Sequence, residues 1–406
     1  MKRKTDRYDV AVVFLVALGL RLLFNWGFVT NKTHADIASM YQYSLRVAQG
    51  IYYGEGVYWP PGFIFLSGGL IRLFGPEGYW TAVRYLQSVL GAATCVFGYL
   101  IDRAAFGSRA AGLLSGFLLA GYLPLIYYTG LAFSETLFLF FFLAAVCFLY
   151  RLARTQAPGD AAWSGFLLGL ATLTRPVSLL VPVLVIPWYW LLWERRWRLV
   201  LGRFLIIGAA LLLTLSPWTV RNLLVTGEPV LVDVNGGVNF YIGHNERATG
   251  TWMDLGQKTN PVILLGGSPE AGRLGYRLGL EFILANPRKE LSLAWTKFKW
   301  FWTKPSDWYI TRYARDRGLP HLEPPIWGAL AVVGAILTRR RWRGTLFLLL
   351  YVLYYNAIIV AFYFAPRYRL VVEPFFLLLA AGGMVEVVSC MLRRRASAKK
   401  PVTGEA

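Results

Sequence analysis

Residues 171–184, ATLTRPVSLLVPVL, place an arginine inside a long apolar run. Arg175 is followed at once by Pro176, and apolar residues continue on both sides. A charged side chain within an apolar segment of membrane length is costly, so it usually faces the protein interior and has a partner of opposite charge. The class of the protein therefore depends on how far this apolar character extends along the chain.

The composition is typical of a membrane protein. Hydrophobic residues make up 56% of the 406-residue chain, and charged residues only 16%. Several apolar runs reach the roughly 20 residues that cross a bilayer as a helix. Only three His and three Cys are present, which disfavours a cytochrome, an Fe–S protein or a disulfide framework. We predict an all-α polytopic membrane protein.

About ten transmembrane helices are predicted from the apolar runs. The first follows a basic flank and shows no small-residue cleavage site, which indicates an uncleaved helix with a cytoplasmic N-terminus. The apolar segment at 60–75 is short and holds a glycine pair, so we interpret it as interfacial or re-entrant. The predicted spans are 9–29, 79–101, 109–129, 133–150, 161–175, 176–193, 203–219, 322–338, 344–364 and 370–391.

The basic residues favour one orientation of these spans. The formal charge is +20, but the basic residues lie in short loops and form no single stripe that would bind nucleic acid. Segments on one side of the predicted membrane hold half of the 42 Lys and Arg. The positive-inside rule predicts that these segments and both termini lie on the cytoplasmic side. The expected location is the cell membrane, that is, the plasma or inner membrane. The segments are 1–7, 102–109, 151–156, 194–203, 338–343 and 393–400.

Four regions follow from this topology. We predict an N-terminal transmembrane catalytic module at 1–219, with interfacial helices in its outer loop 30–78. An extracytoplasmic segment of about 100 residues follows at 220–321, and then C-terminal transmembrane helices at 322–392. The basic tail at 393–406 is expected to be cytoplasmic and disordered.

The outer segment is expected to mix strand and helix. Alternation around Asn235-Gly236-Gly237 predicts a short hairpin. Ser268 as a cap before Pro269 predicts a helix that stops at Asn286-Pro287. A second helix then begins, and its Trp, Phe and Lys residues indicate that it lies on the membrane surface, with Lys297 and Lys299 contacting lipid headgroups.

The length of the apolar segment 161–193 predicts a break between two helices at Arg175. A straight helix over 161–193 would be about 50 Å long, too long for a bilayer. Two helices meeting at Arg175-Pro176 would rise about 21 and 26 Å, less than the roughly 30 Å hydrocarbon core. We therefore expect Arg175 below the outer surface, walled by protein and paired with an anion. An arginine that snorkels from a helix end is the alternative.

Other charged residues map to the same level. Guanidinium groups there would suit an anionic ligand whose tail lies in the membrane, because they match phosphate oxygens well. Internal pairing, such as Arg367 or Arg369 with Glu373, is the alternative for some of them. The arginines are Arg21, Arg84, Arg175, Arg367 and Arg369, and the acids are Asp36, Glu135, Glu323 and Glu373.

A set of motifs through almost the whole chain resembles a known superfamily. The motifs are ADIASMYQYSLRVAQG and YWPPGF, then FSETLFLFFFLAAV, GLATLTRPVSLLVP, SPWTVRNLLVTGEPVLVDVNGGVNFYIGHNERATG and FAPRYRLVVEPFFLLLAAGG. They resemble the polytopic glycosyltransferases that take sugars from polyprenyl-phosphate donors. The branch is the bacterial and archaeal one related to protein O-mannosyltransferases and the lipid A aminoarabinose transferase.

The resemblance implies a catalytic carboxylate in the first outer loop, where Asp36 stands. Family members often carry two adjacent acids, but the neighbour here is Ile37, so Glu135 is a possible second carboxylate. Asp36 could instead only cap its helix. The reaction implied is an inverting displacement in which Asp36 accepts the acceptor hydroxyl proton. Predicted donor-phosphate ligands are Arg175, Arg367, Arg369 and Arg84, and candidate sugar or acceptor contacts are Asn235, Asn239, His244 and Tyr58.

The expected partners are a polyprenyl-phosphate sugar donor, membrane lipids and an acceptor glycan, lipid or protein, with no nucleic acid. No cofactor is predicted, because arginines can supply the charge for a monophosphate leaving group, although a divalent metal stays open. A lipid-linked sugar transporter or flippase is an alternative, but such proteins usually show inverted repeats and polar sites near the midplane. A polysaccharide ligase with a lipid-diphosphate donor is another alternative.

Overall fold

The computed structural model describes residues 2–27, 34–51, 57–254, 256 and 260–398. Helices dominate this part of the chain. In order they are α1 Lys2–Trp26, α2 Ala35–Ala48, α3 Pro61–Phe106, α4 Arg109–Gly121, α5 Leu123–Thr129, α6 Glu135–Thr155, α7 Pro158–Thr174, η1 Pro176–Ser178, α8 Val181–Leu192, α9 Trp197–Thr226, α10 Asn235–Gly243, α11 Pro261–Leu264, α12 Pro269–Ala285, α13 Pro287–Thr303, α14 Trp308–Asp316, α15 Pro324–Leu337, η2 Arg339–Arg341, α16 Trp342–Ala361, α17 Pro366–Arg369 and α18 Glu373–Ala398.

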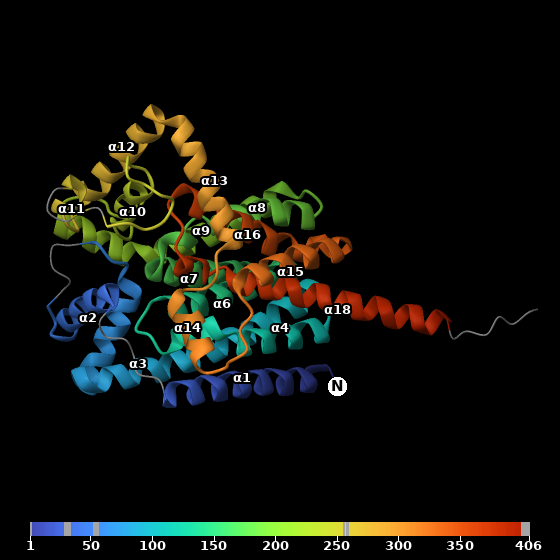
Figure 1. Ribbon diagram of the computed structural model, residues 1–406. Coiled ribbons are helices and arrows are strands. Elements are labelled where there is room, and N and C mark those ends of the chain that lie inside the picture. Colours follow the sequence, from blue (N-terminus) through green and yellow to red (C-terminus); the bar gives the residue numbers. More distant parts are fainter. Residues whose placement is uncertain (1, 28–33, 52–56, 255, 257–259, 399–406) are drawn as a thin grey trace, which may run out of the picture.

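The long helices form a bundle with a smaller helical group at one end (Figure 1). Helices α1, α3, α4 and α18 run along the bundle, while α10, α11, α12 and α13 gather above the end that also carries α2. The N-terminus and the C-terminal end of α18 lie at the opposite end. The large apolar core of this bundle is made chiefly of side chains from α3, α6, α16 and α18.

Each predicted span falls on one helix or on two consecutive ones, which confirms an all-α polytopic architecture. Within the described residues, six helices are long and apolar enough to cross a membrane, and a seventh span results if the bent pair α4 and α5 is taken together. Helices α8 and α15 are apolar but shorter. The total of ten spans therefore stays a prediction.

Helix α3 contains a break between the predicted interfacial segment at 60–75 and the predicted transmembrane span at 79–101. Gly75 has φ 71° and ψ 169°, a conformation that suits glycine, and Pro76 follows it. The predicted interfacial segment thus lies on one side of the break and the predicted span 79–101 on the other. Ranges 28–33 and 52–56 of the first outer loop and the tail at 399–406 lie outside the described residues.

The predicted hairpin around Asn235 is wrong, because these residues form α10. The two glycines let α10 lie directly against α12: a Cβ on Gly237 would sit 2.0 Å from the carbonyl oxygen of Gly272. The carboxylate of Asp233 accepts the N–H of Asn235 at 2.9 Å, which supports the helix start. Helix packing therefore overrides the alternating pattern.

The two helices predicted after the glycine pair are confirmed. Ser268 caps α12 and its hydroxyl accepts the N–H of Ala271, while Pro269 takes the first helical position. Helix α12 ends before Asn286, and Pro287 begins α13. Since proline disfavours a helical residue before it and suits a first turn, the Asn-Pro pair sets the corner between them.

Small residues bring long helices into backbone contact, which is common in membrane bundles. A Cβ on Gly334 of α15 would lie 2.1 Å from the carbonyl oxygen of Leu379 in α18. Gly334→Val should therefore force the two helices apart and reduce the free energy of unfolding by about 1–3 kcal/mol. Thermal unfolding in detergent tests this. Gly208→Val in α9 is the control, because no atom lies within 4 Å of a Cβ there, and equal losses for both variants would contradict the prediction.

Candidate active site

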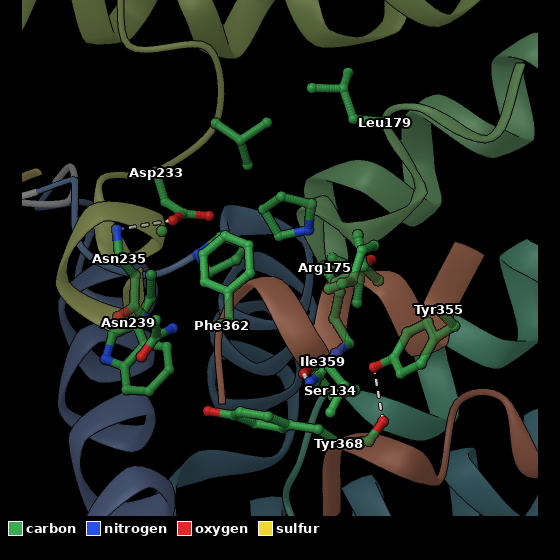
Figure 2. Close-up of a pocket in the computed structure, with 18 of the residues that line it drawn as sticks. Ser134, Arg175, Leu179, Asp233, Asn235, Asn239, Tyr355, Ile359, Phe362 and Tyr368 are labelled. Carbon is green, nitrogen blue, oxygen red and sulfur yellow. Dashed lines mark hydrogen bonds between the residues drawn. The ribbon is translucent and has the colours of Figure 1, made fainter. Parts of the chain in front are cut away.

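A cavity of about 460 Å³ lies where α2, α3 and α6 approach the break between α7 and η1 and the chain around α10 and α17. Figure 2 shows side chains from these separate elements facing one space. The lining joins charged and polar groups with aromatic and aliphatic ones. Arg175, Arg367, Asp233, Asn235 and Asn239 supply the polar part.

Arg175 stands at the predicted break and has the predicted negative partner. Helix α7 ends at Thr174, and Arg175 is extended with φ −151° and ψ 119° before Pro176. Its Nη1 donates to Glu135 Oε1 at 2.8 Å and to the Ser134 hydroxyl at 3.3 Å. The side chain of Arg175 is 14% exposed and that of Glu135 is 1% exposed. The proline ends the α7 hydrogen-bond ladder and so leaves this arginine at the wall of the cavity.

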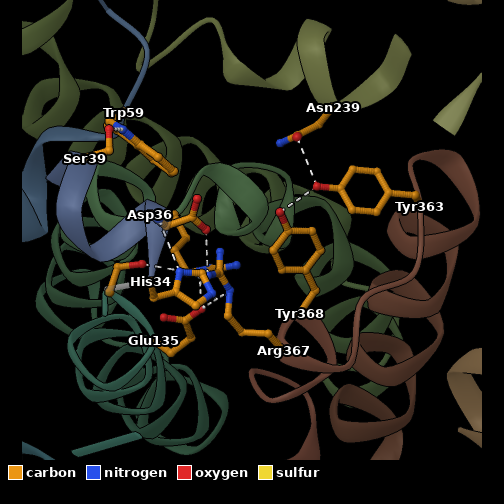
Figure 3. Close-up of polar contacts among 11 residues, drawn as sticks. His34, Asp36, Ser39, Trp59, Glu135, Asn239, Tyr363, Arg367 and Tyr368 are labelled. Atoms are coloured by element: carbon orange, nitrogen blue, oxygen red, sulfur yellow. Dashed lines mark hydrogen bonds and ion pairs between the residues drawn. The ribbon is translucent and has the colours of Figure 1, made fainter. Parts of the chain in front are cut away.

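Arg367 links both candidate carboxylates (Figure 3). Its Nη1 donates to Asp36 Oδ2 at 2.8 Å, and its Nε lies 3.2 Å from Glu135 Oε1. The guanidinium carbon also lies 4.5 Å from the ring centroid of Phe133. Two cations and two anions from α2, α6, α17 and the α7 break therefore form one network.

The two carboxylates differ in surroundings. Asp36 is the second residue of α2, and His34, the N-cap, accepts the N–H of Asp36 through Nδ1 at 3.3 Å. The Asp36 side chain is 34% exposed, whereas that of Glu135 is buried. Neither belongs to the residues that line the cavity, whereas the two arginines do. The acids thus lie beside the cavity, and Asp36 keeps access to solvent.

The other arginines of the predicted ring lie outside this network. Arg369 is buried, pairs with Glu373 at 3.0 Å and donates to carbonyl groups at the end of α13 and just after it. Arg84 donates to the Trp80 carbonyl at 3.0 Å on α3. Arg21 donates to carbonyl groups of α1 and α4. None of these three is among the residues that line the cavity, and Arg369 has the internal partner Glu373 that the sequence analysis gave as the alternative.

The four predicted sugar contacts divide into two groups. Asn235 and Asn239 line the cavity, and Asn239 Oδ1 accepts the Tyr363 hydroxyl at 3.2 Å. Tyr58 packs on the small apolar cluster around α10 and is not among the lining residues. His244 also lies away from the cavity, in a buried polar cluster between α10 and α13.

Lys297 belongs to this buried cluster, so its predicted contact with lipid headgroups is wrong. Glu290 Oε2 lies 2.9 Å from His244 Nδ1, and its Oε1 lies 3.6 Å from Lys297 Nζ. The Lys297 side chain is fully buried on the inner face of α13, whereas Lys299 is exposed. Burial lowers the pKa of Lys297 to about 8, while Glu290 acts in the opposite direction.

This lowered pKa predicts a pH dependence of stability. Between pH 8 and the ordinary lysine value of 10.5, the unfolded chain keeps a proton that the folded chain has lost. The free energy of unfolding should therefore rise through this window by up to about 3 kcal/mol. Unfolding curves of wild type minus Lys297→Met isolate this rise. Lys299→Met is the matched control, and a flat difference curve for Lys297→Met would contradict the prediction.

Asp233 is the cavity residue that the sequence argument missed. It lines the cavity beside Asn235, and burial raises its pKa to about 7 although backbone N–H groups of Asn235 and Gly236 act against this. In the sequence, VDVNGG shows an acid shortly before Asn235, but nothing there indicates that this acid lines a cavity. The described residues contain no group of three His, Cys, Asp or Glu side chains that could hold a metal ion.

A comparison with protein families gives one match. Residues 59–220 match the family described as dolichyl-phosphate-mannose-protein mannosyltransferase. The match covers much of α3 to α9 and includes the Arg175 break. It confirms the resemblance to glycosyltransferases that use polyprenyl-phosphate sugars. The comparison with curated protein sequences gives no match.

Solved structures similar to this chain are distant in sequence. The archaeal oligosaccharyltransferase AglB from Archaeoglobus fulgidus, in complex with an inhibitory peptide and a dolichol-phosphate, has a TM-score of 0.60 at 15% identity over 100% of this chain and 53% of that chain. The apo form of the Archaeoglobus fulgidus oligosaccharyltransferase gives 0.59 at 13% identity, over 97% and 52%. ArnT from Cupriavidus metallidurans bound to undecaprenyl phosphate gives 0.48 at 16% identity, over 98% and 66%. The present chain spans about half the length of the archaeal chains.

Proposed function

We propose that this protein is an integral membrane glycosyltransferase that moves a sugar from a polyprenyl-phosphate donor to an acceptor hydroxyl on the extracytoplasmic face. The observation that carries the proposal is the pair Arg175 and Arg367, which line one cavity and contact Asp36 and Glu135. Two guanidinium groups that converge on one space suit a phosphate better than a neutral ligand.

The cavity offers room for both ends of such a donor. Leu179, Leu180 and Ile358 line it, and Leu180 is exposed on the outside of the bundle. An apolar chain could therefore leave the cavity toward the membrane while the phosphate contacts Arg175 and Arg367. Archaeal oligosaccharyltransferase bound to dolichol-phosphate has the same fold, which supports a lipid phosphate as the ligand class.

The residues suit an inverting displacement. The acceptor hydroxyl oxygen attacks the anomeric carbon while the bond from that carbon to the phosphate oxygen breaks. The hydroxyl proton passes to Asp36, and the two arginines stabilise the charge on the departing phosphate. Asp36 fits the base role better than Glu135, because it is partly exposed and contacts one arginine, whereas Glu135 is buried between two.

The arrangement of the helices supports cytoplasmic termini and an extracytoplasmic site. The N-terminus, the end of α18 and the basic η2 segment lie at the end of the bundle away from α2 and α10 (Figure 1). The positive-inside rule favours the cytoplasm for that end. The proposed site, near α2 and α10, would then face outward.

The experiment that tests the proposal uses purified protein in liposomes with a panel of polyprenyl-phosphate sugars. Mass spectrometry follows free polyprenyl phosphate and the glycosylated acceptor. Release of lipid phosphate together with a new glycoside supports the transferase. Movement of intact lipid-linked sugar across the bilayer, without cleavage of the sugar–phosphate bond, would instead support the transporter.

A further inference from the structure

The carboxyl group of Asp233 lies at the polar part of the cavity and is only half satisfied. Its Oδ1 accepts the N–H of Asn235 at 2.9 Å, so this oxygen supports the start of α10. Its Oδ2 is buried and accepts no hydrogen bond from the described residues. Figure 2 shows the carboxyl group directed into the space that Arg175 enters from another element. A buried oxygen without a donor is costly, so its retention calls for an explanation.

Asp233 lies in a part of the cavity that differs from the part around the two arginines. No basic side chain of the described residues forms an ion pair with Asp233, whereas Arg367 pairs with Asp36 and both arginines pair with Glu135. Asn235, Asn239, Tyr276 and Trp59 line the cavity with it. The cavity therefore has a cationic part and a part made of acceptors, amides and aromatic rings.

This second part has the chemistry of a carbohydrate subsite. Carboxylate and amide oxygens accept hydrogen bonds from sugar hydroxyls, and aromatic rings cover the apolar face of a sugar. The Trp59 ring is held in place by its Nε1, which donates to the Ser39 hydroxyl at 3.0 Å. Gly236 leaves room for Tyr276, because a Cβ there would lie 2.6 Å from the Tyr276 hydroxyl oxygen.

We infer that Asp233 accepts hydrogen bonds from hydroxyl groups of the transferred sugar and determines which sugars the enzyme uses. The inference rests on the proposed function, since the phosphate is held by Arg175 and Arg367 and the sugar extends toward α10. The unpartnered Oδ2 is then completed by the substrate. Asp233 acts by binding and orientation, and it takes no part in proton transfer.

The test measures how the enzyme responds to a missing hydroxyl. Wild type and Asp233→Asn are assayed with undecaprenyl-phosphate mannose, glucose and arabinose, and then with monodeoxy forms of the best donor. Asp233→Asn keeps an oxygen that can accept the Asn235 N–H, so the start of α10 is preserved. Asp254→Asn is the control, because Asp254 accepts the N–H of Gly256 in an exposed turn outside the cavity.

In wild type, removal of the hydroxyl that Asp233 contacts should lower kcat/KM by about 10- to 100-fold, the range for a hydrogen bond to a charged group. In Asp233→Asn the normal donor should lose a similar factor, and the same deoxygenation should then cost much less. Asp254→Asn should behave as wild type.

Two results would overturn the inference while leaving the transferase intact. One is an equal penalty for every deoxy donor in wild type and Asp233→Asn. The other is a kcat/KM of Asp233→Asn that equals that of wild type with every donor. Absence of transfer by wild type with every donor would count against the proposed function itself.

Discussion

Arg175→Ala is expected to lower kcat/KM for the polyprenyl-phosphate donor by about 10²–10³-fold, because it removes the guanidinium that we propose stabilises charge on the leaving phosphate. The side chain lines the cavity at the α7 break and lies 2.8 Å from Glu135. Arg175→Lys should recover part of the loss, since an ammonium keeps the charge but lacks the planar fork. Release of lipid phosphate in liposomes measures both effects.

A matched control separates this loss from a general loss of arginine. Arg84→Ala removes a guanidinium that is not among the residues lining the cavity, so its transfer rate should stay close to wild type. Thermal unfolding of each purified variant shows whether the bundle is intact. Glu135 should still pair with Arg367 in the Arg175 variants, because the two side chains lie 3.2 Å apart in the present chain. Full activity of a folded Arg175→Ala protein would remove this arginine from the phosphate site.

Asp36→Asn is expected to lower kcat by about 10²–10⁴-fold, the contribution typical of a general base. The amide keeps the size of the side chain and can still accept from Arg367, which lies 2.8 Å away. Binding of the donor lipid should therefore change little, so the loss should appear mainly in kcat. Single-turnover release of polyprenyl phosphate measures the chemical step, and a separate lipid-binding assay measures affinity.

Glu135→Gln serves as the comparison for Asp36. It removes a charge from the same network but from a residue that is buried beside both arginines. We expect it to change donor affinity more than kcat. If Glu135→Gln shows the larger loss of kcat and Asp36→Asn transfers sugar normally, the base must be reassigned to Glu135.

The break at Arg175 was predictable because local chemistry and bilayer thickness act together. Proline after arginine ends the helix, and two basic loops bracket a segment too long for one crossing. The need for a negative partner followed from burial alone. That the partner is Glu135, which is 40 residues distant along the chain, depends on how α6 packs against α7.

The remaining features depend on three-dimensional packing that periodicity does not encode. Arg369 and Arg367 are two residues apart, yet one contacts carbonyl groups and the other faces the cavity. Gly237 is typical of a turn in the sequence, whereas in the structure it allows α10 to contact Gly272 of α12. Asp233 lines the cavity only because the chain before α10 packs against the bundle. The placement of the donor and the roles of Asp36 and Glu135 stay predictions.

The sharing of Glu135 Oε1 by Arg175 and Arg367 has a consequence for selectivity among anions. An empty site of two free guanidinium groups would attract inorganic phosphate and other small anions from the surrounding medium. Here an incoming anion meets two guanidinium groups that already bind a resident carboxylate. A small soluble anion brings nothing else to that exchange, whereas a lipid phosphate also brings an anchor in the bilayer and a high local concentration. If the two arginines hold a lipid phosphate, as proposed, the resident carboxylate would favour membrane-bound ligands over small soluble anions.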